Sequence, residues 1–414
     1  MIEKYLNNKV ITKYPIIIIN YENVRDENMA AKRIGVLTGG GDCPGLNNVI
    51  KQIVRESTDR GYEVEGLTEG WRGPIMASLG EYDVEVVTLP LDLVGVRRIN
   101  REGGTILMSS RDTPFNYSGN DVSDKVIEFL NNRYYAVITI GGEDTNGAAG
   151  KLAQRGLRVV GVPKTVDKDV CETDMTLGFD SALDYVTSEL ERIRYTAGSH
   201  GMVYFVEIMG RNAGHLAYWS AAASNTHFLT IPEVEVDMDL LFEAIVRRKD
   251  SLPMERGYTR DGRRYAIVAV AEGTRLKGIG EIRKGREDPS GNIYLGGIAD
   301  YLSQNFNDRT DYDSRSLVLG HLQRSGPPTT DDRLLGIFFG TKAVELVENE
   351  SFRRMVSLRG TDVTDVSLDV VIDRMRVLDA ERCYDAANFK PTPKGSLYQE
   401  IELGKPKKDI DKPK

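Results

Sequence analysis

Residues 33–42 read RIGVLTGGGD, and these ten residues already indicate the fold class. The apolar run at 33–37 has the composition of a buried strand, and three glycines follow it directly. The next segment, residues 48–57, carries Val49, Ile50, Ile53 and Val54 on one helical face. A buried strand, a glycine turn and an amphipathic helix in this order are typical of an α/β domain with a parallel sheet.

The same alternation continues along the chain. A long helix is predicted where Leu183, Val186, Leu190 and Ile193 share one face. Apolar runs that predict further strands occur at 135–140, 157–162, 203–208, 228–231, 266–271 and 316–319. Strands that alternate with helices predict mainly parallel sheets covered on both faces, with any site beyond the carboxyl ends of the strands.

Composition excludes several classes of protein. The 414 residues include 54 Lys+Arg and 62 Asp+Glu, and 40% of the chain is hydrophobic. This apolar content can fill a large core, and the formal net charge of −8 argues against a general nucleic-acid binder. No apolar run approaches the roughly 20 residues of a membrane span. Three widely spaced cysteines, at 43, 171 and 383, predict no disulfide framework and fit a reducing cytoplasm.

The two ends of the chain differ from the rest. Residues 1–28 form an N-terminal extension, and two interpretations remain open: Met29 is an alternative start, or residues 16–19 (IIII) form an added strand or pack on a neighbouring chain. Residues 405–414 (KPKKDIDKPK) are lysine-rich and predict a frayed tail.

Two glycine turns follow the first two predicted strands. In TGGGD, at 38–42, glycines allow backbone amides to approach a phosphate closely, and a helix N-terminus follows. In GGEDT, at 141–145, Glu143 and Asp144 could hold a divalent cation that bridges to a phosphate. A plain structural turn, or a pair of carboxylates that cap a helix, is the alternative in each case.

The third strand ends in PKTVDKD, at 163–169. If this segment is extended, Asp167 and Asp169 point one way, and Lys164 and Lys168 point the other way. A carboxylate beside a bound hydroxyl can act as a general base, and one beside phosphate oxygens can hold magnesium. A solvated loop is the alternative. Polar and cationic groups also follow the later strands, in MGRNAG at 209–214, EGT at 272–274 and LGHLQRSG at 319–326.

From 32 to about 379, the chain resembles the 6-phosphofructokinases. The matching strings are GVLTGGGDCPGLN, GGTILMSSR, GGEDT, PKTVDKD, TLGFDSA, MGRNAGHLA, AEGT and LGHLQRSG. The resemblance implies two Rossmann-like, three-layer α/β lobes with the active site in the cleft between them. The donor lobe would be residues 29–178 with about 323–373, and the fructose 6-phosphate lobe residues 179–322 with about 374–404. It also implies a cytoplasmic homodimer or homotetramer with Mg²⁺ as cofactor.

By the same resemblance, Asp167 is the general base for the 1-hydroxyl of the sugar, and Asp169 lies near the metal and the transferred phosphate. Thr165 contacts that phosphate, and Arg111 and Arg211 neutralise it during transfer. The resemblance also implies that Gly40, Gly41 and Thr145 contact the donor and that Glu143 contacts the metal. Met209, Gly210 and Glu272 would contact the sugar. The 6-phosphate of the sugar would be bound by His321, Arg324 and the Arg315 of a neighbouring subunit.

The phosphoryl donor depends on Asp144 and Lys164, where ATP-using members usually carry glycine. This pair resembles the pyrophosphate-dependent branch, in which the reaction is readily reversible. The alternatives are an ATP-dependent enzyme, a non-catalytic regulatory paralogue and, with less support, a nucleotide kinase. Three positions depart from the family pattern: Glu143 replaces aspartate, Met202 replaces an arginine, and Lys168 replaces asparagine. We expect the Lys168 ammonium to be solvated rather than turned inward.

Overall fold

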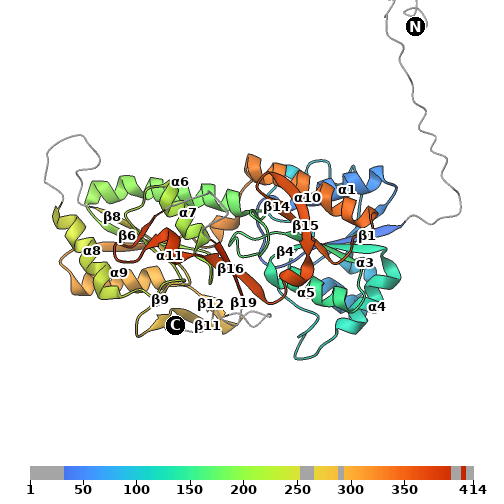
Figure 1. The fold of residues 1–414 in the computed structure, drawn as a ribbon, viewed down its shortest axis with the longest axis horizontal. Helices are drawn as coiled ribbons and strands as arrows, with labels where there is room; N and C mark the ends of the chain where they lie inside the picture. The colour runs from blue at the N-terminus through green and yellow to red at the C-terminus, as the bar shows by residue number, and fades with distance from the viewer. Residues whose placement is uncertain (1–31, 252–264, 288–292, 393–401, 407–414) are drawn as a thin grey trace, which may run out of the picture. The chain divides into compact units, whose positions relative to one another are not determined.

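The computed structural model describes residues 32–251, 265–287, 293–392 and 402–406, all within one compact unit, Lys32–Lys414. The predicted N-terminal extension, residues 1–28, lies outside this range. The described elements include two main sheets and the helices that cover them (Figure 1).

The first sheet has seven strands in the order β15-β14-β5-β4-β1-β2-β3. Pairing is parallel from β14 through β5, β4 and β1 to β2, and antiparallel at the two edges, β14–β15 and β2–β3. The predicted mainly parallel sheet is therefore confirmed. Its strands are β1 (Arg33–Thr38), β2 (Glu63–Leu67), β3 (Thr88–Leu91), β4 (Ala136–Gly141), β5 (Val159–Pro163), β14 (Arg354–Arg359) and β15 (Asp362–Ser367).

The second sheet has four strands, all parallel, in the order β13-β6-β8-β7. Alternate residues of β6 face different helices, as the period of a strand requires. Val206 and Ile208 pack in the core cluster that contains α6 and α7, whereas Phe205 packs on Phe242 of α8 and Phe306 of α9. The strands are β6 (Val203–Ile208), β7 (Phe228–Thr230), β8 (Ala266–Ala271) and β13 (Ser314–Val318).

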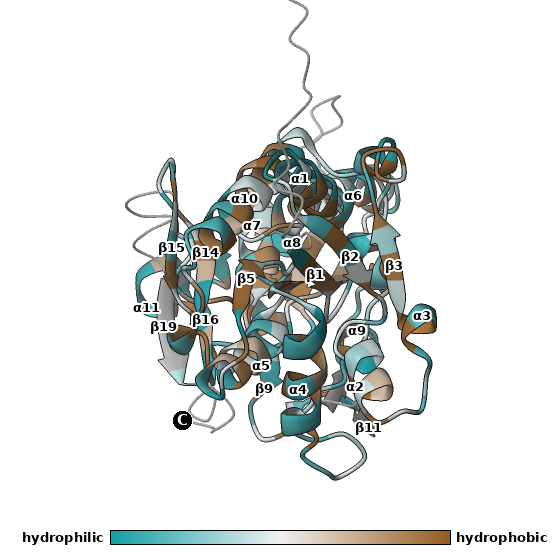
Figure 2. Ribbon diagram, turned by 90° about the vertical axis from the view of Figure 1, so that its right-hand side faces the viewer, coloured by the Kyte–Doolittle hydropathy of each residue, from teal (hydrophilic) through white to brown (hydrophobic). Residues whose placement is uncertain are grey.

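Helices cover both faces of the seven-stranded sheet. α1 and α10 lie on one face and α4 and α5 on the other (Figures 1 and 2). Figure 2 also shows hydrophobic colouring on the ribbons of the central strands. The principal helices are α1 (Leu46–Asp59), α4 (Ser123–Arg133), α5 (Glu143–Gln154), α6 (Phe179–His200), α7 (His215–Ala223), α8 (Met238–Ser251), α9 (Ile298–Arg309) and α10 (Thr330–Glu348).

Shorter elements connect these parts. They are α2 (Arg72–Ser78), α3 (Val84–Val87), η1 (Ile99–Arg101), β9 (Arg275–Leu276), β10 (Gly280–Glu281), β11 (Arg283–Glu287), β12 (Ile293–Leu295), η3 (Gly320–Arg324), η4 (Leu368–Val370), β16 (Arg374–Leu378), α11 (Ala380–Cys383), β17 (Tyr384–Asp385), β18 (Lys390–Pro391) and β19 (Glu402–Pro406).

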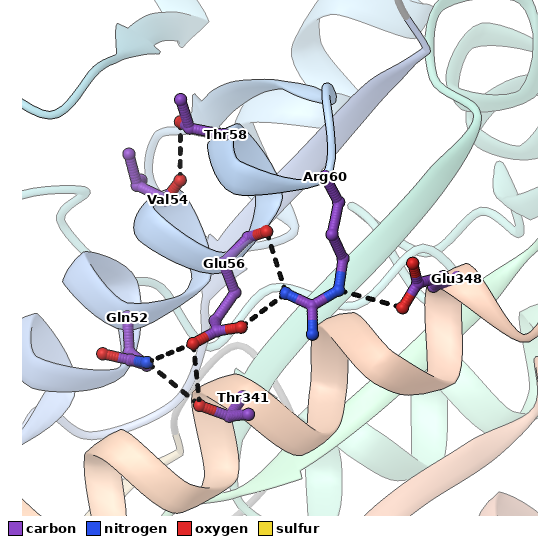
Figure 3. A network of polar contacts seen from close by, with 7 residues as sticks. All are labelled: Gln52, Val54, Glu56, Thr58, Arg60, Thr341 and Glu348. Carbon is purple, nitrogen blue, oxygen red and sulfur yellow. Dashed lines mark hydrogen bonds and ion pairs between the residues drawn. The ribbon is translucent and has the colours of Figure 1, made fainter. Parts of the chain in front are cut away.

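The contact between α1 and α10 joins segments that are far apart in the sequence. Gly336 permits the close approach, since a Cβ there would lie 2.8 Å from the Cβ of Asn48. Beside this contact, Arg60 donates to Glu348 at 2.9 Å and pairs with Glu56 in a polar network (Figure 3). Because these side chains are partly exposed, we assign most of the stabilisation to the apolar packing between the helices.

The tail predicted from residue 405 begins too early. Lys405 and Pro406 belong to β19 and pair with Met375 and Arg374 of β16. Backbone pairing therefore extends at least two residues into the predicted tail, and the rest of the tail lies outside the described residues.

Asp332 joins the start of α10 to the start of α6. Its carboxylate accepts hydrogen bonds from the Gly178 amide at 2.7 Å, the Ser181 amide at 2.9 Å and the Ser181 hydroxyl at 2.5 Å. It is fully buried, and this burial raises its pKa to about 6. The arrangement satisfies backbone donors at the first turn of α6, which begins shortly after the PKTVDKD segment.

We expect Asp332→Ala to lower the free energy of unfolding by about 2 kcal/mol, because it leaves buried amides of α6 without an acceptor. Urea denaturation followed by circular dichroism measures this change. Asp331→Ala is the matched control, since Asp331 is exposed on the same turn. Equal unfolding midpoints for the two variants would contradict this role for Asp332.

Candidate active site

One pocket lies where β1, β4 and β5 end. The turns after these three strands supply much of its lining, and Arg211 and Arg324 enter from the segments after β6 and β13. The predicted site residues that line it are Gly40, Gly41, Arg111, Glu143, Asp144, Thr145, Lys164, Thr165, Asp167, Asp169, Arg211 and Arg324. Strand ends that are distant in sequence therefore meet at one place, as a parallel sheet requires.

The glycine turn after β1 brings the backbone close to Arg324. A Cβ at Gly41 would lie 1.4 Å from Arg324 Nη1, so any side chain at this position would displace the guanidinium group. Gly40 also lines the pocket, but its amide donates to the Ser110 carbonyl oxygen at 2.9 Å. Gly40 thus contributes space for a ligand, while its amide is already used within the protein.

Lys164 connects the end of β5 to this glycine turn. Its side chain is 2% exposed, and its Nζ donates to the Gly41 carbonyl oxygen. Burial lowers its pKa, although the nearby charges of Asp167 and Asp169 act in the opposite direction. The ammonium group is therefore held at the floor of the pocket, beside the turn.

The orientation of Lys164 expected for a regular extended segment does not occur, and Lys164 lies in the pocket where its assignment to the donor requires it. It lines the same pocket as Asp167 and Asp169, whereas a regular extended segment would have turned it away. The segment bends at Val166 and Asp167, and Lys168 adopts a φ of +56°, in the left-handed region, so the alternation of an extended strand is not kept. The prediction that the two aspartates face the same way is confirmed, since both line the pocket.

Asp167 and Asp169 bring two carboxylates into a largely buried space. Each is 6% exposed, and the Oδ1 atom of each has no hydrogen-bond partner within the described protein. Burial, followed by the charge of Asp167, raises the pKa of Asp169 to about 6, while Thr165 and Arg211 oppose this shift. Buried oxygens without a partner indicate that a cation or a substrate hydroxyl completes the site.

Lys168 is not solvated, contrary to the prediction. It is 0% exposed, and its Nζ lies 5.1 Å from the centre of the Phe179 ring and 5.5 Å from that of Trp219. Burial and the Arg376 guanidinium hold its pKa well below the usual range, while Asp174 opposes this shift. The side chain therefore packs into the protein behind the pocket.

The segment after β6 is held by Glu272. The Oε1 atom of Glu272 accepts from the amides of Gly210 at 3.3 Å and Arg211 at 3.0 Å. Desolvation, followed by the charge of Asp167, raises the pKa of Glu272 to about 7. Met209 lies next to the pocket, since Arg324 Nε is 3.4 Å from its Sδ atom. These residues flank the pocket at Arg211 and Arg324 rather than lining it.

Arg315 and His321 lie outside the pocket. Both are exposed, Arg315 on β13 and His321 on the 3-10 helix η3 that ends at Arg324. Arg315 donates to the neighbouring Ser314 carbonyl oxygen at 3.3 Å. Within one chain, the structure brings Arg324 to the pocket and leaves the other two on the surface.

Sequence reasoning missed several pocket residues. Trp71 is 2% exposed, and its Nε1 donates to the Thr145 carbonyl oxygen at 3.4 Å. A lone tryptophan between predicted elements carries no pattern that would reveal this contact. Asp42 could have been predicted from the sequence, because it is the last residue of the TGGGD motif. The other residues that line the pocket are Ser110, Asp112, Thr113, Gly142 and Val166.

The described residues contain no group of three or more His, Cys, Asp or Glu side chains placed to hold a metal ion. A metal in this pocket would therefore need oxygen ligands from the substrates as well as from protein carboxylates. All three cysteines are buried and free, which confirms that there is no disulfide framework. No helix in the described part of the chain has the length and apolar character required to cross a membrane.

Comparisons with known proteins agree with this geometry. A pyrophosphate–fructose 6-phosphate 1-phosphotransferase of Dictyoglomus thermophilum is 42% identical over 85% of this chain and 96% of the relative. An ATP-dependent 6-phosphofructokinase 3 of Streptomyces coelicolor is 41% identical over 86% of this chain and 98% of the relative. Among solved structures, a pyrophosphate-dependent phosphofructokinase from Nitrosospira multiformis superposes with a TM-score of 0.71 at 18% identity, covering 88% of this chain and 89% of that one.

The match to the family as a whole is more extensive than any single motif. The sequence profile described as "Phosphofructokinase" matches residues 33–347, which include the strands that build the pocket. Together with the relatives above, this match shows that the chain belongs to the phosphofructokinase family.

Proposed function

We propose that this protein catalyses the reversible, Mg²⁺-dependent transfer of a phosphoryl group from pyrophosphate to the 1-hydroxyl of fructose 6-phosphate, giving fructose 1,6-bisphosphate and phosphate. The observation that carries the choice of donor is that Asp144 and Lys164 both line the pocket beside the glycine turn. Overall similarity does not select the donor, because relatives named for pyrophosphate and for ATP are 42% and 41% identical.

The charges at the two positions favour a small donor. The Asp144 carboxylate repels a polyanion, and two like charges 4 Å apart cost about 4 kcal/mol at an effective dielectric constant of 20. The buried Lys164 ammonium, at the Gly41 carbonyl oxygen, is placed to bind the far end of pyrophosphate and to stabilise the phosphate that leaves. A nucleotide would have to pass both side chains with its ribose.

The transfer itself requires positioning and charge stabilisation rather than covalent help. Asp167 would take the proton from the 1-hydroxyl through its unpartnered Oδ1 atom. Arg111 and Arg211 would neutralise the phosphoryl group in transit, and Thr165 would contact the same group. Gly40 would leave room for the donor, and Gly41 and Thr145 would bind it.

The residues present fit a divalent metal. Asp169 and Glu143 both line the pocket, and Asp169 Oδ1 has no hydrogen-bond partner among the described residues. A bound Mg²⁺ would lower the repulsion between these acids and the phosphates. We propose that Glu143 and Asp169 hold it together with substrate oxygens.

The sugar would bind between the loops of the seven-stranded sheet and the loops of the four-stranded sheet. Met209, Gly210 and Glu272 would contact its ring, and Arg324 and His321 its 6-phosphate. Arg315 would complete the site of a second copy, which its exposure on the edge strand β13 supports. We therefore propose a homodimer or homotetramer, and a cytoplasmic location is supported by three free, buried thiols.

The sheets support the proposed division into lobes. The donor lobe, residues 29–178 with about 323–373, contains every strand of the seven-stranded sheet. The sugar lobe, residues 179–322 with about 374–404, contains every strand of the four-stranded sheet.

The second candidate is an ATP-dependent 6-phosphofructokinase, and the Streptomyces coelicolor relative is the observation that favours it. A coupled assay that compares pyrophosphate with ATP, at fixed fructose 6-phosphate and magnesium, decides between them. We expect turnover with pyrophosphate and little with ATP. The reverse preference would refute the proposed donor, and sugar phosphate binding without turnover would indicate a regulatory paralogue.

Lys164→Ala should raise the KM for pyrophosphate by about tenfold or more, because a charge-assisted contact to the donor is lost. The KM for fructose 6-phosphate should change little. Lys151→Ala is the matched control, since Lys151 lies on α5, with its side chain 39% exposed, and pairs with Asp373 at 3.0 Å. An unchanged KM for pyrophosphate would count against the donor assignment.

Asp167→Ser should reduce kcat by about 10²–10⁴-fold, as expected when a general base is removed. Steady-state kinetics at saturating substrates measure the change, and circular dichroism establishes that the variant is folded. The control is Asp362→Ser, because Asp362 is exposed at the start of β15. Near-normal turnover by the Asp167 variant would remove this residue from the catalytic role.

A further inference from the structure

Lys168 lies between the two pocket carboxylates in sequence, yet its side chain packs on the opposite side of the backbone. Its φ of +56° places it in the left-handed region, which residues with a side chain rarely adopt. Asp167 and Asp169 both line the pocket, whereas Lys168 does not. A strained residue of this kind persists only where its surroundings hold it.

Two aromatic rings from different helices surround the Lys168 ammonium. Nζ lies 5.1 Å from the centre of the Phe179 ring, at the start of α6, and 5.5 Å from that of Trp219, on α7. Trp219 is itself packed edge-on against Tyr218, at a centroid distance of 5.2 Å. Both ring distances are within the range of cation–π attraction. We call Phe179 and Trp219 the lysine cage.

The charged groups near the cage come from several elements. Arg376 of β16 and Asp174 are the charges that act most strongly on Lys168, with opposite signs, and His215 at the start of α7 also lies near both cations. The Asp174 carboxylate accepts from the Gly360 amide at 2.6 Å, which fixes the negative charge. Lys168 thus has a positive charge, Arg376, and a negative charge, Asp174, in its surroundings.

Two further contacts hold the residues on either side of Lys168. The Asp167 amide donates to Thr165 Oγ1 at 3.0 Å. The Asp169 carbonyl oxygen accepts from the Arg376 amide at 2.8 Å. Asp167 is therefore held within its own segment by Thr165, whereas Lys168 is held by the lysine cage and Asp169 by β16. Arg376 lies C-terminal to the family match at 33–347, so this attachment comes from outside the matched range.

We propose that Lys168 is a positioning residue for the phosphoryl transfer: packed in the lysine cage, it holds the 167–169 turn so that both carboxylates face the pocket. This inference rests on the proposed function. The cage also links the 167–169 turn to the segment that we assign to the sugar. Trp219 lies on α7, which begins at His215, directly after the 209–214 segment. Misplacement of reacting groups by about 1 Å can reduce a rate about 10²-fold.

Two substitutions of Lys168 separate its stem from its charge. Lys168→Ala empties the cage, and we expect kcat to fall about 10²-fold while the KM values for both substrates change less than about threefold. Lys168→Met keeps a stem of similar length between the rings without the charge, and we expect a loss of about tenfold. Trp219 emission should shift in both variants, because the charge next to the indole is lost.

Lys249→Ala and Lys249→Met are the matched controls. Lys249 is also buried, at 2% exposure; its Nζ lies 4.4 Å from the centre of the Tyr312 ring and donates to the Gly201 carbonyl oxygen at 2.5 Å. It lies on α8, away from the pocket lining. These variants should lose thermal stability while kcat stays at the wild-type level.

The outcomes distinguish this inference from the proposed function. Wild-type turnover with pyrophosphate tests the function, and the ratio of variant to wild-type kcat, with whichever donor is used, tests the role of Lys168. The inference is overturned by a Lys168→Met protein with wild-type kcat, by a kcat loss no larger than that of the Lys249 variants, or by an effect confined to KM. If Lys168→Ala does not fold, Lys168→Met alone decides. A wild-type protein that uses neither donor overturns both proposals.

Discussion

Burial of two carboxylates at the end of β5 is the constraint on which this site depends. Asp167 and Asp169 are each 6% exposed, and charged groups in such places are unfavourable unless they are paired or hydrogen-bonded. Lys164, Arg211 and Arg324 bring positive charge to the same pocket. Burial and the charge of Asp167 raise the pKa of Asp169 to about 6, so the shift caused by burial is only partly opposed by Thr165 and Arg211. A cation and phosphate-bearing substrates are the ligands that would complete the site.

Much of the fold could be predicted from the sequence because buried parallel strands leave a strong pattern. Strands β6 and β8 coincide with the predicted runs at 203–208 and 266–271, since every position in β8 is buried and apolar. Two parallel strands, β2 (EVEGL) and β14 (RMVSLR), were missed because charged residues and a glycine interrupt their apolar runs. The antiparallel edge strands β3 and β15 were missed because most of their residues are exposed or half-buried and they carry few continuous apolar runs. Edge strands of this kind resemble ordinary loops in sequence.

The sequence predicted which segments line the site better than it predicted how their side chains are oriented. Strand order places the turns after β1, β4 and β5 together, so their motifs could be assigned to one pocket without coordinates. The orientation of Lys164 and the burial of Lys168 could not be predicted, because the chain bends at Val166 and Asp167 and Lys168 has a left-handed φ, so the alternation that the prediction used is interrupted. Trp71 joins the pocket through the Thr145 carbonyl oxygen, a contact that no local pattern records.

The choice of phosphoryl donor is a local property in a family with a common scaffold. Relatives with either donor name are about equally similar to this chain, so the difference in free energy between donors must come from a few side chains. Asp144 and Lys164 bring opposite charges to the pocket lining, whereas Arg324 fills the space that Gly41 leaves open. In the proposed assignment, repulsion would exclude a larger polyanion while the ammonium would retain a small one, and specificity commonly needs both an attractive and a repulsive element. The lysine cage has a different role from this pair, because it positions the carboxylates of Asp167 and Asp169 and does not select the phosphoryl donor.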